Sequence, residues 1–207
     1  MSNPPLIHVV DDDESLRTAL LRLLGAAGFE ARGYASTGEF LLAPLPDRPG
    51  CVLLDLRMPG PSGLDLQSAL QQRGIGLAVV FLTGHGDVAS TVQAMKAGAV
   101  DFLTKPVDGE TLLDAIRRAL EQDARRRATR AEAAELEARF ATLTPREVEV
   151  FQGVVAGKLN KQIAHELGIA ERTVKLHRAE AMVKLGVGSA AELGRLAERL
   201  RLLRERS

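Results

Sequence analysis

Short apolar segments that favour strands alternate with segments of helical periodicity through the first 120 residues of the chain. The helical segments repeat leucine, valine and phenylalanine at the three- and four-residue spacing of an amphipathic helix. This alternation predicts a parallel β-sheet with helices on both faces, because nearly continuous apolar strands are what burial on both faces requires. The predicted strands are Leu6–Val10, Phe29–Tyr34, Cys51–Leu54, Leu77–Leu82 and Val100–Leu103. We therefore expect an α/β domain with a five-stranded, doubly wound sheet.

The fifth helix of this domain, which Asp108 is placed to cap, continues into a charged segment. Residues 121–140 contain no Gly or Pro and are rich in Ala, Glu and Arg, which predicts a continuous helical linker. Two interpretations of its thin apolar seam stay open: pairing with the linker of a second copy, or a solvated rigid spacer. The seam consists of Ala124, Ala128, Ala131 or Leu136.

A second, purely helical domain begins after the linker. Thr144 and Glu147 have the spacing of a capping box, and Pro145 suits the first position of a helix. Glycines then divide the segment into four predicted helices: Pro145–Ala156, Asn160–Leu167, Glu171–Leu185 and Ala190–Leu203. The predicted organisation is a domain at 1–121, a helical linker at 122–141 and a four-helix domain at 142–207.

Composition excludes several classes of protein. The longest uninterrupted apolar stretch, Leu77–Leu82, is far too short for a membrane span, and Met1–Pro5 does not resemble a secretory signal, so we expect a cytoplasmic protein with no membrane partner. The single Cys51 excludes an internal disulfide and a Cys-based zinc site. The net charge of zero conceals −4 over residues 1–120 and +4 over residues 142–207. This asymmetry suggests metal or phosphate chemistry in the first domain and a polyanion partner for the second.

The predicted strands carry a set of polar residues at their carboxyl ends, where open α/β sheets bind ligands. These residues are Asp11, Asp12 and Asp13, then Asp55, Thr83 and Lys105, which precedes Pro106. Clustered carboxylates repel one another unless a hard cation such as Mg²⁺ lies among them. Asp55 could then attack phosphorus as a nucleophile while Thr83 and Lys105 contact the phosphoryl oxygens. The set predicts a phosphoacceptor site.

Simpler interpretations of the same residues exist. The Asp triplet could merely cap a helix, Asp55 could be a turn residue and Lys105 a solvated lysine. Their joint placement at strand ends makes coincidence the weaker explanation. Of the histidines nearby, His85 is expected to be solvated and His8 structural. An aspartyl-phosphate phosphatase would have a second acid two residues after the nucleophile, where this chain has Arg57.

The first domain, about residues 5–121, resembles a bacterial response-regulator receiver. The motifs that carry the likeness are Val9-Val10-Asp11-Asp12-Asp13, Leu54-Asp55-Leu56-Arg57-Met58-Pro59-Gly60, Leu82-Thr83-Gly84-His85-Gly86 and Leu103-Thr104-Lys105-Pro106. The resemblance implies a flavodoxin-like fold and phosphorylation of Asp55 by a sensor histidine kinase. It further implies Mg²⁺ (or Mn²⁺) held by Asp11, Asp12, Asp55 and the Arg57 carbonyl. Thr83 and Lys105 would sense the phosphate, Phe102 would be the switch residue, and the bond before Pro106 would be cis.

The segment Lys161–Lys175 has the layout of a helix-turn-helix, with Gly168 at the turn. Helical spacing places Val174, His177, Ala181, Met182 and Leu185 on the inner face of the second helix, where core packing is the favoured role of His177. The residues expected to face outward and contact DNA are Arg172, Lys175, Leu176, Arg178 and Ala179, with Thr173 and Lys161 beside them. Basic side chains would contact phosphates or guanine edges, and Leu176 and Ala179 thymine methyl groups.

The whole segment 142–204 is similar to the LuxR-type four-helix domain, through Leu143-Thr144-Pro145-Arg146-Glu147, Thr173-Val174-Lys175-Leu176-His177-Arg178 and Lys184-Leu185-Gly186. A receiver joined to this domain defines the NarL/FixJ family, and Thr83–Val88, Met95–Ala99 and Asn160-Lys161 are most like its FixJ/StyR branch. The resemblance implies a transcriptional regulator, not an enzyme beyond self-modification at Asp55. Phosphorylation would switch the face formed by residues 88–105, form a homodimer and bring two domains to promoter DNA, with RNA polymerase as a partner. A phosphate-independent regulator stays open as the alternative.

Overall fold

The computed structural model describes residues 4–84 and 88–204, with side chains described up to residue 201. His85 and the expectation attached to it lie outside these residues. The chain forms two compact units, Met1–Arg127 and Ala128–Ser207. The first unit therefore ends later than the predicted boundary at residue 121. None of the helices described is both long and apolar enough to cross a membrane.

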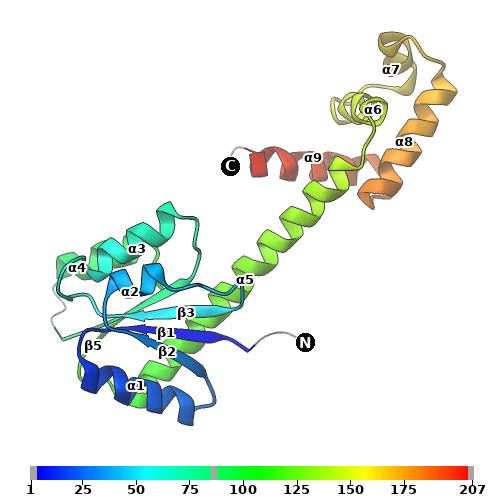
Figure 1. The fold of residues 1–207 in the computed structure, drawn as a ribbon. Coiled ribbons are helices and arrows are strands. Elements are labelled where there is room, and N and C mark those ends of the chain that lie inside the picture. The colour runs from blue at the N-terminus through cyan, green and yellow to red at the C-terminus, as the bar shows by residue number, and fades with distance from the viewer. Residues whose placement is uncertain (1–3, 85–87, 205–207) are drawn as a thin grey trace. The chain divides into compact units, whose positions relative to one another are not determined.

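The N-terminal unit is built on a five-stranded parallel sheet with the order β2-β1-β3-β4-β5 (Figure 1). The strands are β1 Leu6–Val10, β2 Glu30–Tyr34, β3 Gly50–Leu54, β4 Ala78–Thr83 and β5 Asp101–Thr104. The helices between them are α1 Glu14–Ala26, α2 Thr37–Leu42, α3 Gly63–Gln72 and α4 Val88–Lys96. The predicted α/β class and the parallel five-stranded sheet are confirmed, with strand ends that shift by a residue or so.

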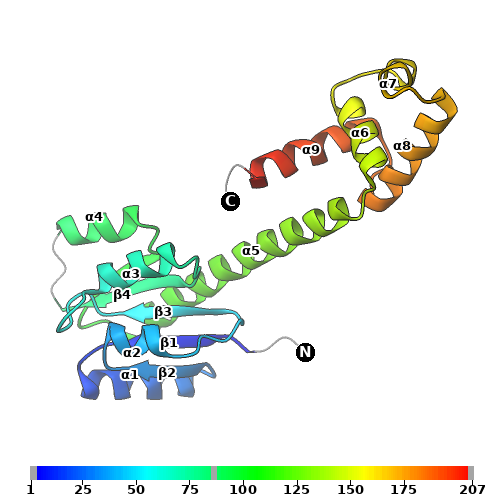
Figure 2. The same ribbon diagram turned by 45° about the horizontal axis from the view of Figure 1, so that its top comes forward.

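Helices cover both faces of the sheet, as the apolar strands predict (Figure 2). The side chains of Ile7, Val9 and Leu53 pack with apolar residues of α1 and of the fifth helix, α5 (Gly109–Ala141). Val10 and Leu54 point the opposite way and pack with residues of α2, α3 and α4. Because successive residues of a strand face opposite sides, each buried strand contributes to two cores.

Helix α5, Gly109–Ala141, is continuous over 33 residues, and Asp108 Oδ1 accepts the Thr111 N–H at 2.9 Å at its start. Its residue Asp123 is buried although the surrounding sequence is charged. The Asp123 carboxylate accepts the Gly50 N–H at 3.1 Å, Arg126 Nη2 at 2.7 Å and Arg127 Nε at 2.9 Å. Arg127 also donates to Asp47 Oδ1 at 2.7 Å and to the Arg48 carbonyl at 2.5 Å. We call this group the Asp123 anchor; it joins α5 to the chain that leads into β3.

The C-terminal unit contains the end of α5 and four further helices: α6 Pro145–Val155, α7 Asn160–Leu167, α8 Glu171–Leu185 and α9 Ala190–Arg204. The predicted capping box is present, because Thr144 Oγ accepts the Glu147 N–H and the Glu147 carboxylate accepts the Thr144 N–H. Leu136 and Phe140 of α5 pack with Phe151, Leu185 and Leu193. The last turns of the predicted linker thus belong to the core of this unit.

The four residues of the predicted linker seam have different environments. Ala124, Ala128 and Ala131 are exposed, whereas Leu136 is buried in the C-terminal unit. Leu136 is therefore committed to the core of its own chain.

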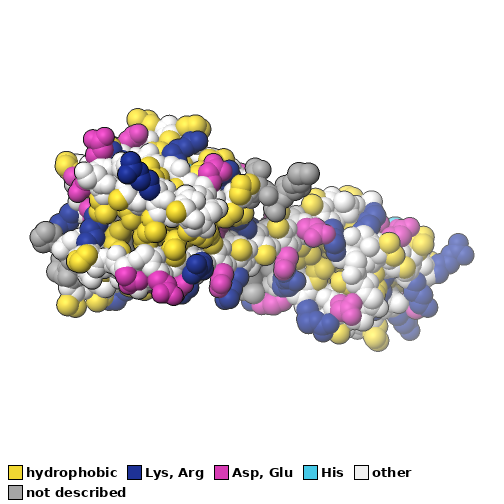
Figure 3. Space-filling view, turned by 90° about the horizontal axis from the view of Figure 1, so that it is seen from below, with side chains coloured by type: hydrophobic (Ala, Val, Ile, Leu, Met, Phe, Trp, Pro, Cys, Tyr) yellow, Lys and Arg dark blue, Asp and Glu magenta, His cyan; other side chains and the backbone are white. Residues whose placement is uncertain are grey.

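Acidic and basic side chains are interspersed over the face displayed in Figure 3, in keeping with a net charge of zero.

Candidate functional site

The hydrogen bonds of the sheet continue past the strand ends and keep the predicted site residues adjacent. The Asp11 N–H donates to the Tyr34 carbonyl at 3.1 Å, and the Asp55 N–H donates to the Val10 carbonyl at 2.9 Å. On the other side of the sheet the Lys105 N–H donates to the Thr83 carbonyl at 2.8 Å. Because all five strands are parallel, these residues emerge at one edge of the sheet.

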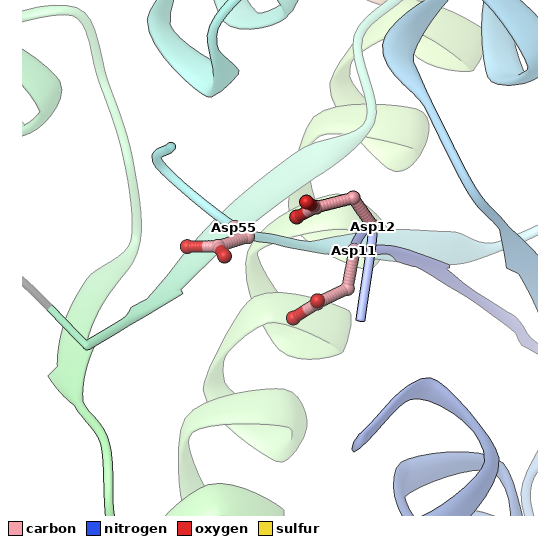
Figure 4. A group of neighbouring side chains, drawn as sticks. All are labelled: Asp11, Asp12 and Asp55. Carbon is pink, nitrogen blue, oxygen red and sulfur yellow. The ribbon is translucent and has the colours of Figure 1, made fainter. Parts of the chain in front are cut away.

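Three carboxylates gather at this edge (Figure 4). Oxygen atoms of Asp11, Asp12 and Asp55 all lie within 4.8 Å of one another. Asp11 is buried, Asp12 is exposed and Asp55 is intermediate, so the cluster opens to solvent on one side. Carboxylate oxygens are hard ligands of the kind Mg²⁺ prefers, and it is usually held by one or two carboxylates with the remaining positions filled by water and phosphate. The donor set therefore fits a magnesium ion.

Lys105 bridges two of the three acids. Its Nζ lies 2.8 Å from Asp11 Oδ2 and 3.1 Å from Asp55 Oδ2. Burial works to lower the pKa of the Lys105 ammonium, but the bonds and charges of Asp11 and Asp55 together outweigh it and raise that pKa. Burial also raises the pKa of Asp11, an effect that the bond from Lys105 opposes. Lys105 is accordingly a charged ammonium that offsets part of the repulsion within the cluster.

The other predicted site residues lie on β4, on β5 and in the segments that follow β3 and β5. Thr83 is buried at the end of β4, and the Lys105–Pro106 bond is cis. Phe102 is half-buried on β5, with its ring centroid 5.9 Å from that of Phe81. Arg57 is exposed, and its main-chain N–H donates to Asp55 Oδ1 at 3.4 Å.

Asp13 and Arg17 both contact Asp11. The sequence analysis expected Asp13 at this edge as part of the Asp triplet, but it assigned no part to Arg17. Asp13 caps α1 by accepting the Leu16 N–H at 3.0 Å, so capping does explain one member of the Asp triplet. Its own N–H donates to Asp11 Oδ1 at 3.0 Å. Arg17 Nη1 donates to the Asp11 carbonyl at 2.7 Å. The one sequence signal for the latter contact is a glycine inside β2, at position 33.

The predicted DNA-reading elements are α7 and α8. Gly168 ends α7 in the left-handed conformation, with φ of 64°, which glycine adopts without strain. Val174, Ala181 and Leu185 are buried, as their spacing predicts. Four of the residues predicted to contact DNA, and Lys161 on α7, are exposed: Arg172, Lys175, Leu176 and Ala179.

Two residues of this predicted surface are less accessible than the helical spacing suggests. Arg178 is half-buried, and its Nη1 donates to Asn160 Oδ1 at 3.2 Å, because α7 packs against that side of α8. Thr173 is also half-buried. His177 is half-buried with Nδ1 3.6 Å from Glu180 Oε2, a position between the core and the surface. In this structure the Arg178 guanidinium thus forms a hydrogen bond within its own domain.

Comparison with known families assigns both units. Residues 7–117 match the response regulator receiver domain, and residues 141–197 match the bacterial regulatory proteins of the luxR family. Nodulation protein W of Bradyrhizobium diazoefficiens is 45% identical over 96% of this chain and 88% of its own length. Transcriptional regulatory protein FixJ of Azorhizobium caulinodans is 42% identical over 92% of this chain and 90% of its own.

Solved structures agree with these matches. The structure of response regulator StyR is 48% identical, covers 95% of this chain and 100% of that chain, and superposes with a TM-score of 0.84. Full-length FixJ from B. japonicum is 39% identical over 98% of this chain and 99% of that chain, with a TM-score of 0.58. The chain therefore belongs to the NarL/FixJ family of response regulators, transcriptional regulators in which a receiver domain is joined to a LuxR-type DNA-binding domain.

Proposed function

We propose that Asp55 accepts a phosphoryl group from a phosphohistidine of a sensor histidine kinase. The observation that carries this proposal is the convergence of Asp55 with Asp11, Asp12 and Lys105 at one edge of the sheet. A carboxylate oxygen of Asp55 forms a P–O bond as the P–N bond breaks, and the departing imidazole keeps the electron pair and takes up a proton. The product is an aspartyl phosphate on the regulator.

Mg²⁺ (or Mn²⁺) would be held by the carboxylates of Asp11, Asp12 and Asp55 and by the Arg57 main-chain carbonyl. When bound, it would neutralise charge on the transferring phosphoryl group. Lys105 already carries its positive charge at 3.1 Å from Asp55 Oδ2, so it can exchange this bond for one to a phosphoryl oxygen. The hydroxyl of Thr83, at the end of β4, would bind a second phosphoryl oxygen.

Movement of Thr83 toward the phosphoryl group would let Phe102 repack and would alter the face formed by α4 and β5. This face carries exposed apolar side chains on α4: Val88 is 81% exposed, Val92 45% and Met95 44%. Exposed apolar clusters mark interaction surfaces. The partner we propose is a second copy of the chain, so that phosphorylation produces a homodimer.

A homodimer would present two α8 helices to the two half-sites of a promoter, with Arg172, Lys175, Leu176, Ala179, Thr173, Arg178 and Lys161 as the contact residues. Binding two half-sites through one dimer raises affinity without any new contact within a half-site. RNA polymerase would be recruited at such a promoter. Turnover at Asp55 is self-modification, so no separate substrate is proposed.

The test compares wild type with Asp55→Ala in analytical sedimentation, with and without a small phosphodonor and Mg²⁺, followed by operator selection on the same samples. We expect only phosphodonor-treated wild type to dimerise and to gain DNA affinity. Equal DNA binding by both proteins without phosphodonor would contradict gating at Asp55 and favour a phosphate-independent regulator.

A further inference from the structure

Arg17, at the end of the first turn of α1, contacts the main chain of the acidic cluster, whereas Lys105 binds its carboxylates. Its Nη1 donates to the main-chain carbonyl of Asp11 at 2.7 Å, while Lys105 binds the Asp11 carboxylate. The main-chain N–H of Asp11 donates to Tyr34, and its second carboxylate oxygen accepts the N–H of Asp13. Each polar atom of Asp11 therefore has a partner, and Arg17 is the one that binds the peptide linking Asp11 to Asp12.

Strand β2 provides space for Arg17. A Cβ atom added to Gly33 would lie 3.1 Å from both Cγ and Cδ of Arg17 and 3.1 Å from Leu21 Cδ1. The backbone of Gly33 does not have the positive φ that favours glycine, so its conformation suits any residue. Glycine within a strand weakens the strand and often marks a close approach by another group. Here the approaching group is the aliphatic stem of Arg17.

From these contacts we propose that Arg17 is a positioning residue for the cation site: it fixes the Asp11–Asp12 peptide and thereby the separation of the two neighbouring carboxylates. The inference rests on the proposed function, in which those carboxylates hold Mg²⁺. Groups that orient metal ligands typically contribute 10–100-fold to metal affinity. Asp12 is exposed, and the contacts described include no hydrogen bond or ion pair between its carboxylate and a residue outside the cluster. The peptide that joins Asp12 to Asp11, which Arg17 binds, is therefore the main restraint on its position.

The sign of the effect separates positioning from simple electrostatics. A guanidinium near three carboxylates repels an incoming cation, so removing its charge alone would strengthen cation binding. Loss of positioning weakens cation binding. Arg17→Met keeps an unbranched stem over Gly33 and deletes the donor, and the exposed Arg22 of the same helix offers a matched control, because Arg22→Met makes the same change of charge.

The experiment measures Mn²⁺ binding to the unphosphorylated full-length chain by electron paramagnetic resonance, with thermal unfolding of each protein as a folding check. We expect Arg17→Met to raise the Mn²⁺ dissociation constant about tenfold, Arg22→Met to leave it unchanged, and Arg17→Lys to bind more tightly than Arg17→Met. Arg17→Met that binds Mn²⁺ as tightly as wild type, or more tightly, overturns the proposal.

A second variant covers the case in which Arg17→Met does not fold. Gly33→Ala retains the guanidinium but displaces its stem, and we expect weaker Mn²⁺ binding than in wild type; unchanged binding overturns the proposal. A wild-type chain that neither binds Mn²⁺ nor accepts phosphate would instead overturn the proposed function itself. If wild type binds Mn²⁺ and accepts phosphate, and Arg17→Met binds Mn²⁺ as wild type does, then only the proposed role of Arg17 is overturned.

Discussion

The buried carboxylate of Asp123 accepts a hydrogen bond from the main-chain N–H of Gly50 at 3.1 Å, across 73 residues of sequence. A side chain at position 50 would collide with the Leu6 carbonyl, since an added Cβ would lie 2.4 Å from that oxygen. Gly50 is therefore required by close packing, and its N–H is brought to Asp123 by the same packing. The pair ties the helix that leaves the receiver to the start of the central strand.

Asp123→Ala should lower the free energy of unfolding of the receiver by about 2 kcal/mol, because the buried Gly50 N–H loses its acceptor. Denaturant unfolding followed by circular dichroism measures this change. The control is Asp114→Ala on the same helix, which removes an exposed ion pair with Arg117 and should change stability by less than about 0.5 kcal/mol. Equal effects of the two substitutions would contradict a stabilising role for the Asp123 anchor.

Acid should destabilise the receiver through His8. Burial, assisted by the positive charges of Arg32 and Arg48, lowers the pKa of His8 from 6.5 to about 4. Below the unfolded value of 6.5 the unfolded chain binds a proton that the folded chain rejects, so stability is lost as the pH falls from 6.5 toward 4. The difference in pKa sets an upper limit of about 3 kcal/mol on this loss.

The measurement compares the pH dependence of unfolding for wild type and His8→Gln. Other groups titrate in both proteins, so the difference between the two curves isolates His8. Its Nδ1 lies 3.0 Å from the Tyr34 hydroxyl, a bond that glutamine is chosen to retain. Parallel curves between pH 6.5 and 4 would show that His8 keeps an ordinary pKa.

In the DNA-binding domain, Lys184→Met should destabilise at neutral pH and much less in acid. Lys184 Nζ lies 2.7 Å from Glu147 Oε2, and this bond is the main reason that the pKa of the buried Glu147 is lowered. The pair therefore stabilises the fold above pH 4.5, and its contribution disappears as the pH falls through the folded pKa of Glu147. Removing the ammonium at pH 7 leaves a buried carboxylate with one partner fewer, at a cost of roughly 2 kcal/mol.

Thermal unfolding of the DNA-binding domain at pH 7 and at successively lower pH values, continued below pH 4, measures this effect. Lys158→Met provides the control, since Lys158 forms a partly exposed pair with Glu166 at 2.6 Å. We expect the control to change little at any of these pH values. A Lys184→Met variant whose destabilisation stays the same down to the lowest pH at which the domain folds would rule out the charge of Glu147 as the cause.

Lys175→Ala should weaken DNA binding by similar factors for operator and unrelated sequences, because an exposed lysine on α8 is placed to neutralise a phosphate. The slope of log K against log salt should become less negative by about one. Binding titrations at several salt concentrations measure both quantities. Lys158→Ala, on the loop before α7, tests whether the loss of any lysine of the domain has this effect. An equal change in the salt slope for Lys158→Ala would show that Lys175 is not specifically placed to contact DNA.

Local pattern was sufficient for much of this molecule. The apolar runs predicted each strand, because a strand buried on both faces must be apolar along its length. The same pattern located Asp11, Asp55, Thr83 and Lys105, since a residue directly after a buried parallel strand lies at the carboxyl edge of the sheet. Thr144 and Glu147 were predictable as a cap for an equally local reason: both partners lie within one turn of the helix.

Contacts between segments distant in the sequence required the folded structure. The sequence around Asp123 reads as an exposed, charged helix, and only the docking of α5 beside Gly50 makes that carboxylate buried. Arg178 has the periodicity of an outward residue until α7 packs against it. A glycine inside a strand, as at Gly33, indicates a close approach by some group, but only the folded sheet identifies that group as the Arg17 stem. Periodicity reports which face of an element is apolar, whereas the partner of a polar group depends on which elements meet there, and that is settled when the whole chain packs.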